Sequence, residues 1–137
     1  MALLDVLKTT RDYDYSDLDL DFIAHPATGD ITIKYGVEAL KRSIKNLVFT
    51  NFYDRPFNPQ IGCNARKLLF ENITPLTANF LTDHITNVLV NFEPRVNILD
   101  VQVQMNTDEN GYNAVITFTP INVPEPQVVG IFLKQIR

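Results

Sequence analysis

A segment bounded by two prolines, Pro75 and Pro94, places the strongest constraint on how this chain can fold. Thr74 is a favourable N-cap and Pro75 fits the first position of a helix. Pro94 cannot continue a helix and disfavours helical backbone angles at Glu93, so the helix ends at or just before that residue. Apolar residues recur at helical spacing between the prolines: Leu76, Phe80, Leu81, Ile85, Val88, Leu89 and Phe92. The segment predicts a long amphipathic helix.

Alternating residues after this helix predict an antiparallel pair of strands. The first strand is indicated by the alternating apolar residues Leu99, Val101, Val103 and Met105. The dipeptide Asn110-Gly111 is a strong turn signal. The second strand is indicated by Tyr112, Ala114, Ile116 and Phe118. A last apolar run, residues 128–136, follows three prolines and is a further strand candidate.

The region before the long helix contains a predicted hairpin and further helices. Residues 18–22 and 31–35 alternate on either side of a turn with Pro26 and Gly29. An apolar helical stripe follows and stops near Asn51: Val37, Leu40, Ile44, Leu47 and Val48. Residues 68–70 predict a short helix. This order predicts an α+β fold: one small domain over residues 18–137, with helices on one face of a small antiparallel sheet, after an acidic arm of residues 1–17.

Composition excludes several classes of function. The 137 residues carry a net charge of -4, and the first thirty contain seven aspartates against Lys8 and Arg11, or 2 - 7 = -5. The acidic start and the absence of a basic stripe argue against nucleic-acid binding. Cys63 is the only cysteine, so no intramolecular disulfide is possible, and we expect it to be a buried apolar filler. No apolar stretch is long enough to predict a signal-peptide core or a membrane span, so we expect a protein made in the cytosol.

The sequence contains few residues that could form a site for nucleophilic catalysis or for a metal ion. The two serines, Ser16 and Ser43, lie in neither a nucleophile elbow nor a histidine-adjacent position. His25 and His84, together with one cysteine, cannot assemble a structural zinc site. The few glycines form no phosphate-binding loop. We therefore expect no cofactor and no metal.

A pair of carboxylates is harder to exclude. A glycosidase needs two carboxyl groups about 5 to 9.5 Å apart, one of them kept protonated by apolar surroundings. Glu71 and Glu93 each follow apolar residues and are the best candidates. The chain has no tryptophan to stack on a sugar ring, which argues against this activity.

The tripeptide Glu93-Pro94-Arg95 has two interpretations. Its charges could be solvated groups around a helix stop, or Arg95 could present a bidentate fork to a carboxylate or backbone carbonyls of a partner. The same choice applies to the proline-rich segment after the first helix, which is either a rigid loop or a preorganised docking edge. Composition and spacing leave both alternatives open.

Four stretches in consistent order over roughly residues 13–120 carry a family resemblance: "YSDLDLDF…HPATGDI", "SIKNLVFTNFYDRPFNPQIGC", "LLFENITPLTA" and "NFEPRVNILDVQV". They resemble the baseplate wedge protein of contractile-tailed phages, a family also called the tail sheath initiator and often labelled lysozyme-like. The type VI secretion baseplate has a similar component. No catalytic pair of the lysozyme-like label maps onto this sequence, so the resemblance implies a protein that is not an enzyme.

The resemblance implies two kinds of site. Glu93, Pro94 and Arg95 match the family's hallmark motif, which docks the subunit on the core bundle of the other wedge proteins. Arg55, Pro56 and Phe57 match a second docking element. If Arg95 lies at a surface junction, Arg95→Ala should leave the domain folded. The last apolar run is the expected site of strand exchange with the sheath: Val128, Val129, Ile131, Phe132, Leu133 and Ile136.

The implied assembly is a tail baseplate in the virion, built in the host cytoplasm with six-fold symmetry. The expected partners are other baseplate wedge proteins and the tail sheath protein, with tail tube or hub proteins as further candidates, and no nucleic acid or membrane. The alternatives are a type VI secretion baseplate component and a peptidoglycan-degrading lysozyme.

Overall fold

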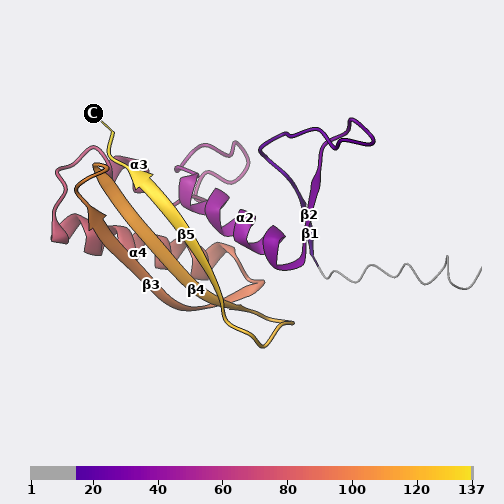
Figure 1. Cartoon of the computed structure of the whole chain (residues 1–137). Coiled ribbons are helices and arrows are strands. Elements are labelled where there is room, and N and C mark those ends of the chain that lie inside the picture. Colours follow the sequence, from indigo (N-terminus) through magenta and orange to yellow (C-terminus); the bar gives the residue numbers. More distant parts are fainter. Residues whose placement is uncertain (1–14, 137) are drawn as a thin grey trace, which may run out of the picture.

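The structure is a computed structural model that describes residues 15–136. A short hairpin comes first, made of β1 (Ser16–Leu18) and β2 (Ile33–Tyr35). Three helices follow: α2 (Gly36–Phe49), α3 (Ala65–Leu68) and α4 (Pro75–Phe92). The chain closes with β3 (Val96–Asn106), β4 (Gly111–Pro120) and β5 (Gln127–Lys134). Figure 1 shows the hairpin projecting from one end of the body.

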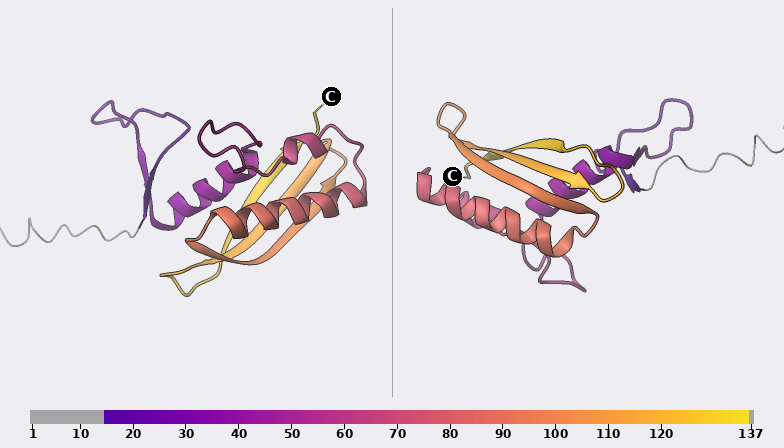
Figure 2. Two further views of the ribbon diagram at one scale, coloured as in Figure 1. Left: turned by 180° about the vertical axis from the view of Figure 1, so that it is seen from behind. Right: turned by 90° about the horizontal axis from the view of Figure 1, so that it is seen from below.

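The body has two layers. Strands β3, β4 and β5 form an antiparallel sheet in that order, and α2 and α4 lie along one of its faces (Figure 2). Side chains between the layers are fully buried, among them Leu40, Ile44, Leu81, Ile85, Leu89, Tyr112, Ile116 and Phe118. The other face of the sheet is exposed, as is common for antiparallel sheets. This confirms the predicted α+β fold with helices on one face of a small antiparallel sheet.

Both ends of α4 form as the prolines predict. The Thr74 hydroxyl accepts a hydrogen bond from the backbone N–H of Thr77 at 3.2 Å, which satisfies one of the free donors of the first turn. Pro75 occupies the first turn and Glu93 is the C-cap residue. The predicted helix is confirmed.

The predicted pair of strands is also confirmed. Asn110 has a positive φ of 52° in the turn before β4, a backbone conformation that asparagine tolerates better than most residues. β3 carries a register shift between Ile98 and Asp100, so it bends near its start.

Three details differ from the sequence-based expectations. The short helix lies at 65–68 rather than 68–70, because Asn64 takes a left-handed conformation (φ 55°) that starts the helix at Ala65. The hairpin strands are shorter than the alternation indicates, because the chain turns at residues 20–21. Residues 15–17, assigned by sequence to the acidic arm, belong to the hairpin, and the rest of that arm lies outside the described residues.

Candidate functional site

Glu93 is a buried carboxylate at the end of a helix. Its side chain is 3% exposed, and its backbone N–H donates to Leu89 O at 3.0 Å to close α4. Negative charge is unfavourable at this end, because the helix dipole already places partial negative charge there. A buried carboxylate also requires hydrogen-bond partners, so the surrounding side chains must compensate for both costs.

Two side chains supply these partners. Arg95 donates from Nε to Glu93 Oε1 at 2.7 Å and from Nη2 to Oε2 at 3.1 Å, which is a bidentate fork. The Ser43 hydroxyl, from the middle of α2, also donates to Glu93 Oε2. Burial raises the pKa of Glu93, but the hydrogen bonds from Arg95 and Ser43 outweigh it and hold the pKa below its ordinary value. Glu93 is therefore a stable anion.

Arg95 also reaches the hairpin. Its Nη1 lies 3.5 Å from Asp17 Oδ2, and its guanidinium carbon lies 5.5 Å from the centre of the Tyr15 ring, within cation–π range. The Tyr15 hydroxyl accepts a hydrogen bond from Asn122 at 3.4 Å. We call Tyr15, Asp17, Ser43, Glu93 and Arg95 the Glu93–Arg95 cluster. It joins the hairpin, α2 and the junction of α4 with β3.

This geometry corrects the interpretation of Glu93 and Arg95 as solvated charges around a helix stop. Glu93 is buried, and the Arg95 side chain is only 29% exposed. The fork of Arg95 goes to Glu93 of the same chain rather than outward. Each guanidinium nitrogen therefore faces a carboxylate of the same chain, Nε and Nη2 at Glu93 and Nη1 at Asp17.

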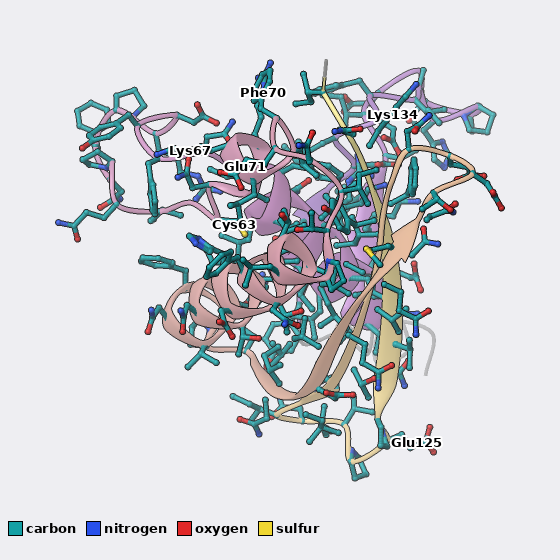
Figure 3. All side chains as sticks on the ribbon, turned by 90° about the vertical axis from the view of Figure 1, so that its left-hand side faces the viewer. Cys63, Lys67, Phe70, Glu71, Glu125 and Lys134 are labelled. Atoms are coloured by element: carbon teal, nitrogen blue, oxygen red, sulfur yellow. The ribbon has the colours of Figure 1, made fainter. Side chains whose placement is uncertain are left out.

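The carboxylate pair of a glycosidase is not assembled. Glu71 is exposed and precedes α4, whereas Glu93 follows it, so the 18-residue helix separates them by about 27 Å. Figure 3 shows Glu71 at the end of the molecule that carries Phe70 and Lys134. Glu93, moreover, is ionised and paired, and cannot act as a protonated acid. The two residues cannot act as a pair in one sugar-binding cleft.

The segment with Arg55, Pro56 and Phe57 is an ordered loop between α2 and α3. Phe57 is 96% exposed. The loop is closed at its base, where Cys63 N donates to Thr50 O at 2.9 Å, and again higher up, where Tyr53 N donates to Pro59 O at 3.0 Å. Among the described residues, no hydrogen bond or ion pair joins this loop to the Glu93–Arg95 cluster. The two predicted docking elements therefore form separate surfaces.

Gly62 fixes the neck of this loop. A Cβ atom at this position would lie 2.6 Å from the backbone carbon of Asn51 and 2.7 Å from the backbone nitrogen of Phe52. Since both atoms are backbone, no side-chain movement relieves the clash, and only glycine fits. The loop holds Phe57 outward on a fixed base.

The predicted strand-exchange residues lie in or beside β5, and their side chains divide between the two faces. Val129, Ile131 and Leu133 point toward the helices, whereas Val128 and Phe132 are exposed on the other face. Ile136 follows the strand, and its N–H donates to Leu69 O at 2.9 Å. β5 pairs with β4 only, so its other edge borders no strand of the described chain.

A half-open groove of about 340 Å³ lies at the C-terminal end of β5. It is lined by Val48, Phe49, Asn51, Ala65, Arg66, Leu69, Phe132, Leu133, Lys134 and Ile136. The lining contains two basic residues and no acidic one. The groove therefore suits an apolar side chain with a carboxylate nearby.

Sequence reasoning missed the residues that contact the hallmark motif. Ser43 is separated from Glu93 by 50 positions, and Asp17 and Tyr15 come from the segment assigned to the arm. The available signal was Ser43 itself, a small polar residue beside the buried stripe of α2. In the described part of the chain, no cluster of side chains suits a metal ion and no helix is long and apolar enough to cross a membrane.

Comparison with known proteins identifies the family. Residues 34–119 match the family described as "Baseplate wedge protein gp25". The chain belongs to the gp25 family of baseplate wedge proteins. Baseplate wedge protein gp25 of Enterobacteria phage T4 is 33% identical over 111 residues, which are 81% of this chain and 83% of that protein. The family resemblance and the place in the tail baseplate of the virion are confirmed.

Two solved structures share the fold. A chain in the cryo-EM structure of the anti-feeding prophage baseplate, 6-fold symmetrised, has a TM-score of 0.60 at 20% identity, covering 90% of this chain and 87% of that one. A crystal structure of a Geobacter sulfurreducens protein labelled a candidate tail lysozyme has a TM-score of 0.60 at 23% identity, covering 72% and 91%. At these identities the likeness shows the fold alone.

Proposed function

We propose that this chain is a non-enzymatic subunit that joins the wedges of a contractile-tail baseplate to the first ring of the sheath. The observation that carries the proposal is the open edge of β5 in a member of a baseplate wedge family. Six copies around the tail axis agree with the six-fold baseplate that contains a chain of the same fold. The separation of Glu71 from the ion-paired Glu93 supports a structural role.

The edge of β5 is the better of the two sheet edges for an incoming strand. The register shift at Ile98 and Asp100 bends the β3 edge, and such bulges hinder strand pairing. β5 pairs with β4 without a register shift, so its free edge is regular. A foreign strand can add to such an edge through backbone hydrogen bonds.

The alternation of hydrogen-bonded pairs between β4 and β5 indicates which backbone groups of β5 a sheath strand would use. Gln135 N donates to Asn110 O at 2.8 Å, and hydrogen-bonded pairs alternate with non-hydrogen-bonded pairs along an antiparallel ladder. Gln135 and every second residue before it in β5 therefore direct their backbone N–H and C=O groups to β4. The residues between them direct theirs to the free edge: Val128, Gly130, Phe132 and Lys134. The incoming strand would then end in the groove beside Arg66 and Lys134.

Val128→Pro tests strand addition. The substitution removes one outward N–H and leaves the β4 ladder intact, so the chain should fold and enter baseplates while sheath polymerisation fails. Val128→Thr keeps the N–H and is the matched control. Electron microscopy of assembled tails distinguishes the outcomes. Full-length sheaths on baseplates that contain Val128→Pro would disprove strand addition at this edge.

We propose two surfaces for docking on the wedge core. At the Glu93–Arg95 cluster, Glu93 fixes the guanidinium, and the 29% of the side chain that is exposed would donate its remaining N–H groups to a carbonyl or carboxylate of a partner. At the loop, Phe57 presents a nearly fully exposed ring on a closed base, which lowers the ordering cost of binding. An exposed aromatic ring of this kind is a typical interface anchor.

Phe57→Ala tests the docking loop without disturbing the fold. We expect unchanged thermal stability and a loss of incorporation into baseplates, because the ring makes almost no contact within the chain. Phe70→Ala is the matched control, since Phe70 is 59% exposed and lies outside the loop. Co-purification with the wedge proteins measures incorporation. Equal incorporation of both variants would remove Phe57 from the docking surface.

A further inference from the structure

A surface hairpin normally packs its apolar face on the body and exposes its polar face, whereas the hairpin β1–β2 does the reverse. Its register pairs Asp17 with Lys34 and Leu18 with Ile33. Directly opposite residues share a face and neighbours along a strand alternate, so Asp17 and Lys34 lie on one face and Leu18 and Ile33 on the other. The charged face is turned toward the body, as its contacts show.

Ion pairs hold the charged face. Asp19 is 3% exposed and lies 3.4 Å from Lys34 Nζ and 3.9 Å from Arg42 Nη2 of helix α2. Arg42 also lies 2.7 Å from Asp21. Asp17 adds the contact with Arg95 at 3.5 Å. The hairpin is therefore fastened to α2 and to the start of β3 by its polar side.

The apolar face is left in solvent. Leu18 is 55% exposed, Ile33 46% and Ile31 41%. Ile31 continues the same face, because it forms an isolated bridge with Ala24 and lies two residues before Ile33. A lone two-stranded hairpin is marginally stable in water, and an apolar face half exposed on it is unusual for a surface element. Such a face suits contact with another chain.

A hollow on this face shows where such a chain would sit. It measures about 390 Å³ and is lined by Ile31, Ile33 and Tyr35 together with polar residues that precede β2, namely His25, Thr28, Asp30 and Thr32. Asp30 is exposed and forms no ion pair with any described residue. The hollow thus combines two aliphatic side chains with a polar side that includes the Asp30 carboxylate.

Charge decides the kind of occupant. Asp17, Asp19 and Asp21 are paired with Arg95, Lys34 and Arg42, so Asp30 is the acidic charge that the described hairpin leaves for a partner. A second copy of the chain would bring the same carboxylate to the contact, and like charges oppose such a contact. We propose that this face binds an amphipathic basic segment of another baseplate protein, with aliphatic side chains over Leu18 and Ile33 and a lysine or arginine at Asp30.

This contact is additional to the two docking surfaces and the strand-addition edge. The family model matches residues 34–119, so β1 and the turn lie outside that match, although the resemblance in sequence extends over them. The inference rests on membership in the baseplate family and not on the proposed roles of Phe57 or β5. A failure of this contact can therefore be distinguished from a failure of docking by Phe57 or of strand addition at β5.

The first test is site-specific photocrosslinking in assembled baseplates. A benzoylphenylalanine probe at position 33 should crosslink to one segment of a different protein, and mass spectrometry should show that segment to be aliphatic and net positive. The same probe at Met105, which is 43% exposed on β3, is the matched control and should not label that segment. Crosslinks to a second copy, to an acidic segment, or to nothing would overturn the proposal.

Substitutions provide the second test. Ile33→Asp should incorporate into baseplates roughly tenfold more weakly than Met105→Asp, because a charge replaces the centre of an apolar contact. Asp30→Lys should also weaken incorporation. Because Asp30 is exposed and remote from the core, this variant still tests the contact if Ile33→Asp lowers the melting temperature. Incorporation of both variants at the level of Met105→Asp would overturn the proposal, even if Phe57→Ala fails to assemble.

Discussion

The hairpin and the three-stranded sheet are built from the same alternation of polar and apolar residues but are attached to the body in opposite ways. In the sheet, apolar residues such as Ile116 and Phe118 face the helices and are fully buried. In the hairpin, charged residues face the body and Leu18 and Ile33 face solvent. The sheet is held by removing apolar surface from water, whereas the hairpin is held by ion pairs. Alternation thus predicts a strand but not which face is covered.

The largest expected effect is on the sheet. Ile116→Ala should lower the free energy of unfolding by about 3 to 4 kcal/mol, because Ile116 is fully buried between the layers and its removal leaves a cavity. Its neighbour Val115, 40% exposed on the opposite face, is the control, and Val115→Ala should lower it by less than about 1 kcal/mol. Chemical denaturation measures both. Equal losses would contradict the assignment of the covered face.

Arg95→Ala should lower the free energy of unfolding by about 3 kcal/mol, because it leaves the buried Glu93 carboxylate with Ser43 as its remaining partner. This revises the expectation, based on a surface junction, that the variant would fold normally. The double variant Glu93→Gln with Arg95→Ala should recover part of the loss. If the single variant is as stable as the parent, the cluster does not join hairpin, helix and sheet.

Acid should weaken the cluster. The pKa of Glu93 is depressed below its ordinary value of 4.5, so its contribution is fully present above that pH and is lost as pH falls through the folded-state pKa. Glu93→Gln should flatten the dependence of stability on pH in this range. Thermal melts from neutral pH downward measure it, and parallel curves for the parent and the variant would contradict the assignment.

The smallest effect is expected at the hairpin. Arg42→Ala should change global stability by about 1 kcal/mol or less but speed hydrogen exchange of hairpin amides such as Asp19, which donates to Thr32 O at 2.9 Å. Raising the salt concentration should act in the same direction. Lys45→Ala, exposed on the same helix, is the control. Exchange that accelerates equally in the sheet would show that the hairpin is not held separately.

Local signals allowed much of the fold to be predicted. The ends of α4 follow from Thr74, Pro75 and Pro94, which act within one turn of the helix. The turn at Asn110 likewise depends on neighbouring residues. Such elements form as predicted because their determinants are adjacent in sequence.

The site could be predicted only in part. The motif at Glu93 and Arg95 was visible, but the Ser43 contact spans 50 positions and the Asp17 contact depends on where the hairpin lies. The inward orientation of the hairpin's charges was equally hidden, because reversing the two faces leaves the alternation unchanged. Contacts between distant segments, rather than any local pattern, decide these features.

The glycine at position 62 also bears on how the protein can change over time. Backbone atoms of Asn51 and Phe52 pack closely against Gly62, so the residues between Phe52 and Gly62 extend from a narrow base whose two strands of chain are in contact. Substitutions at Phe57, which is 96% exposed, are then nearly free of any cost to folding. If this loop docks on a partner as proposed, substitutions within it can change which partner is bound while the core sequence stays constant.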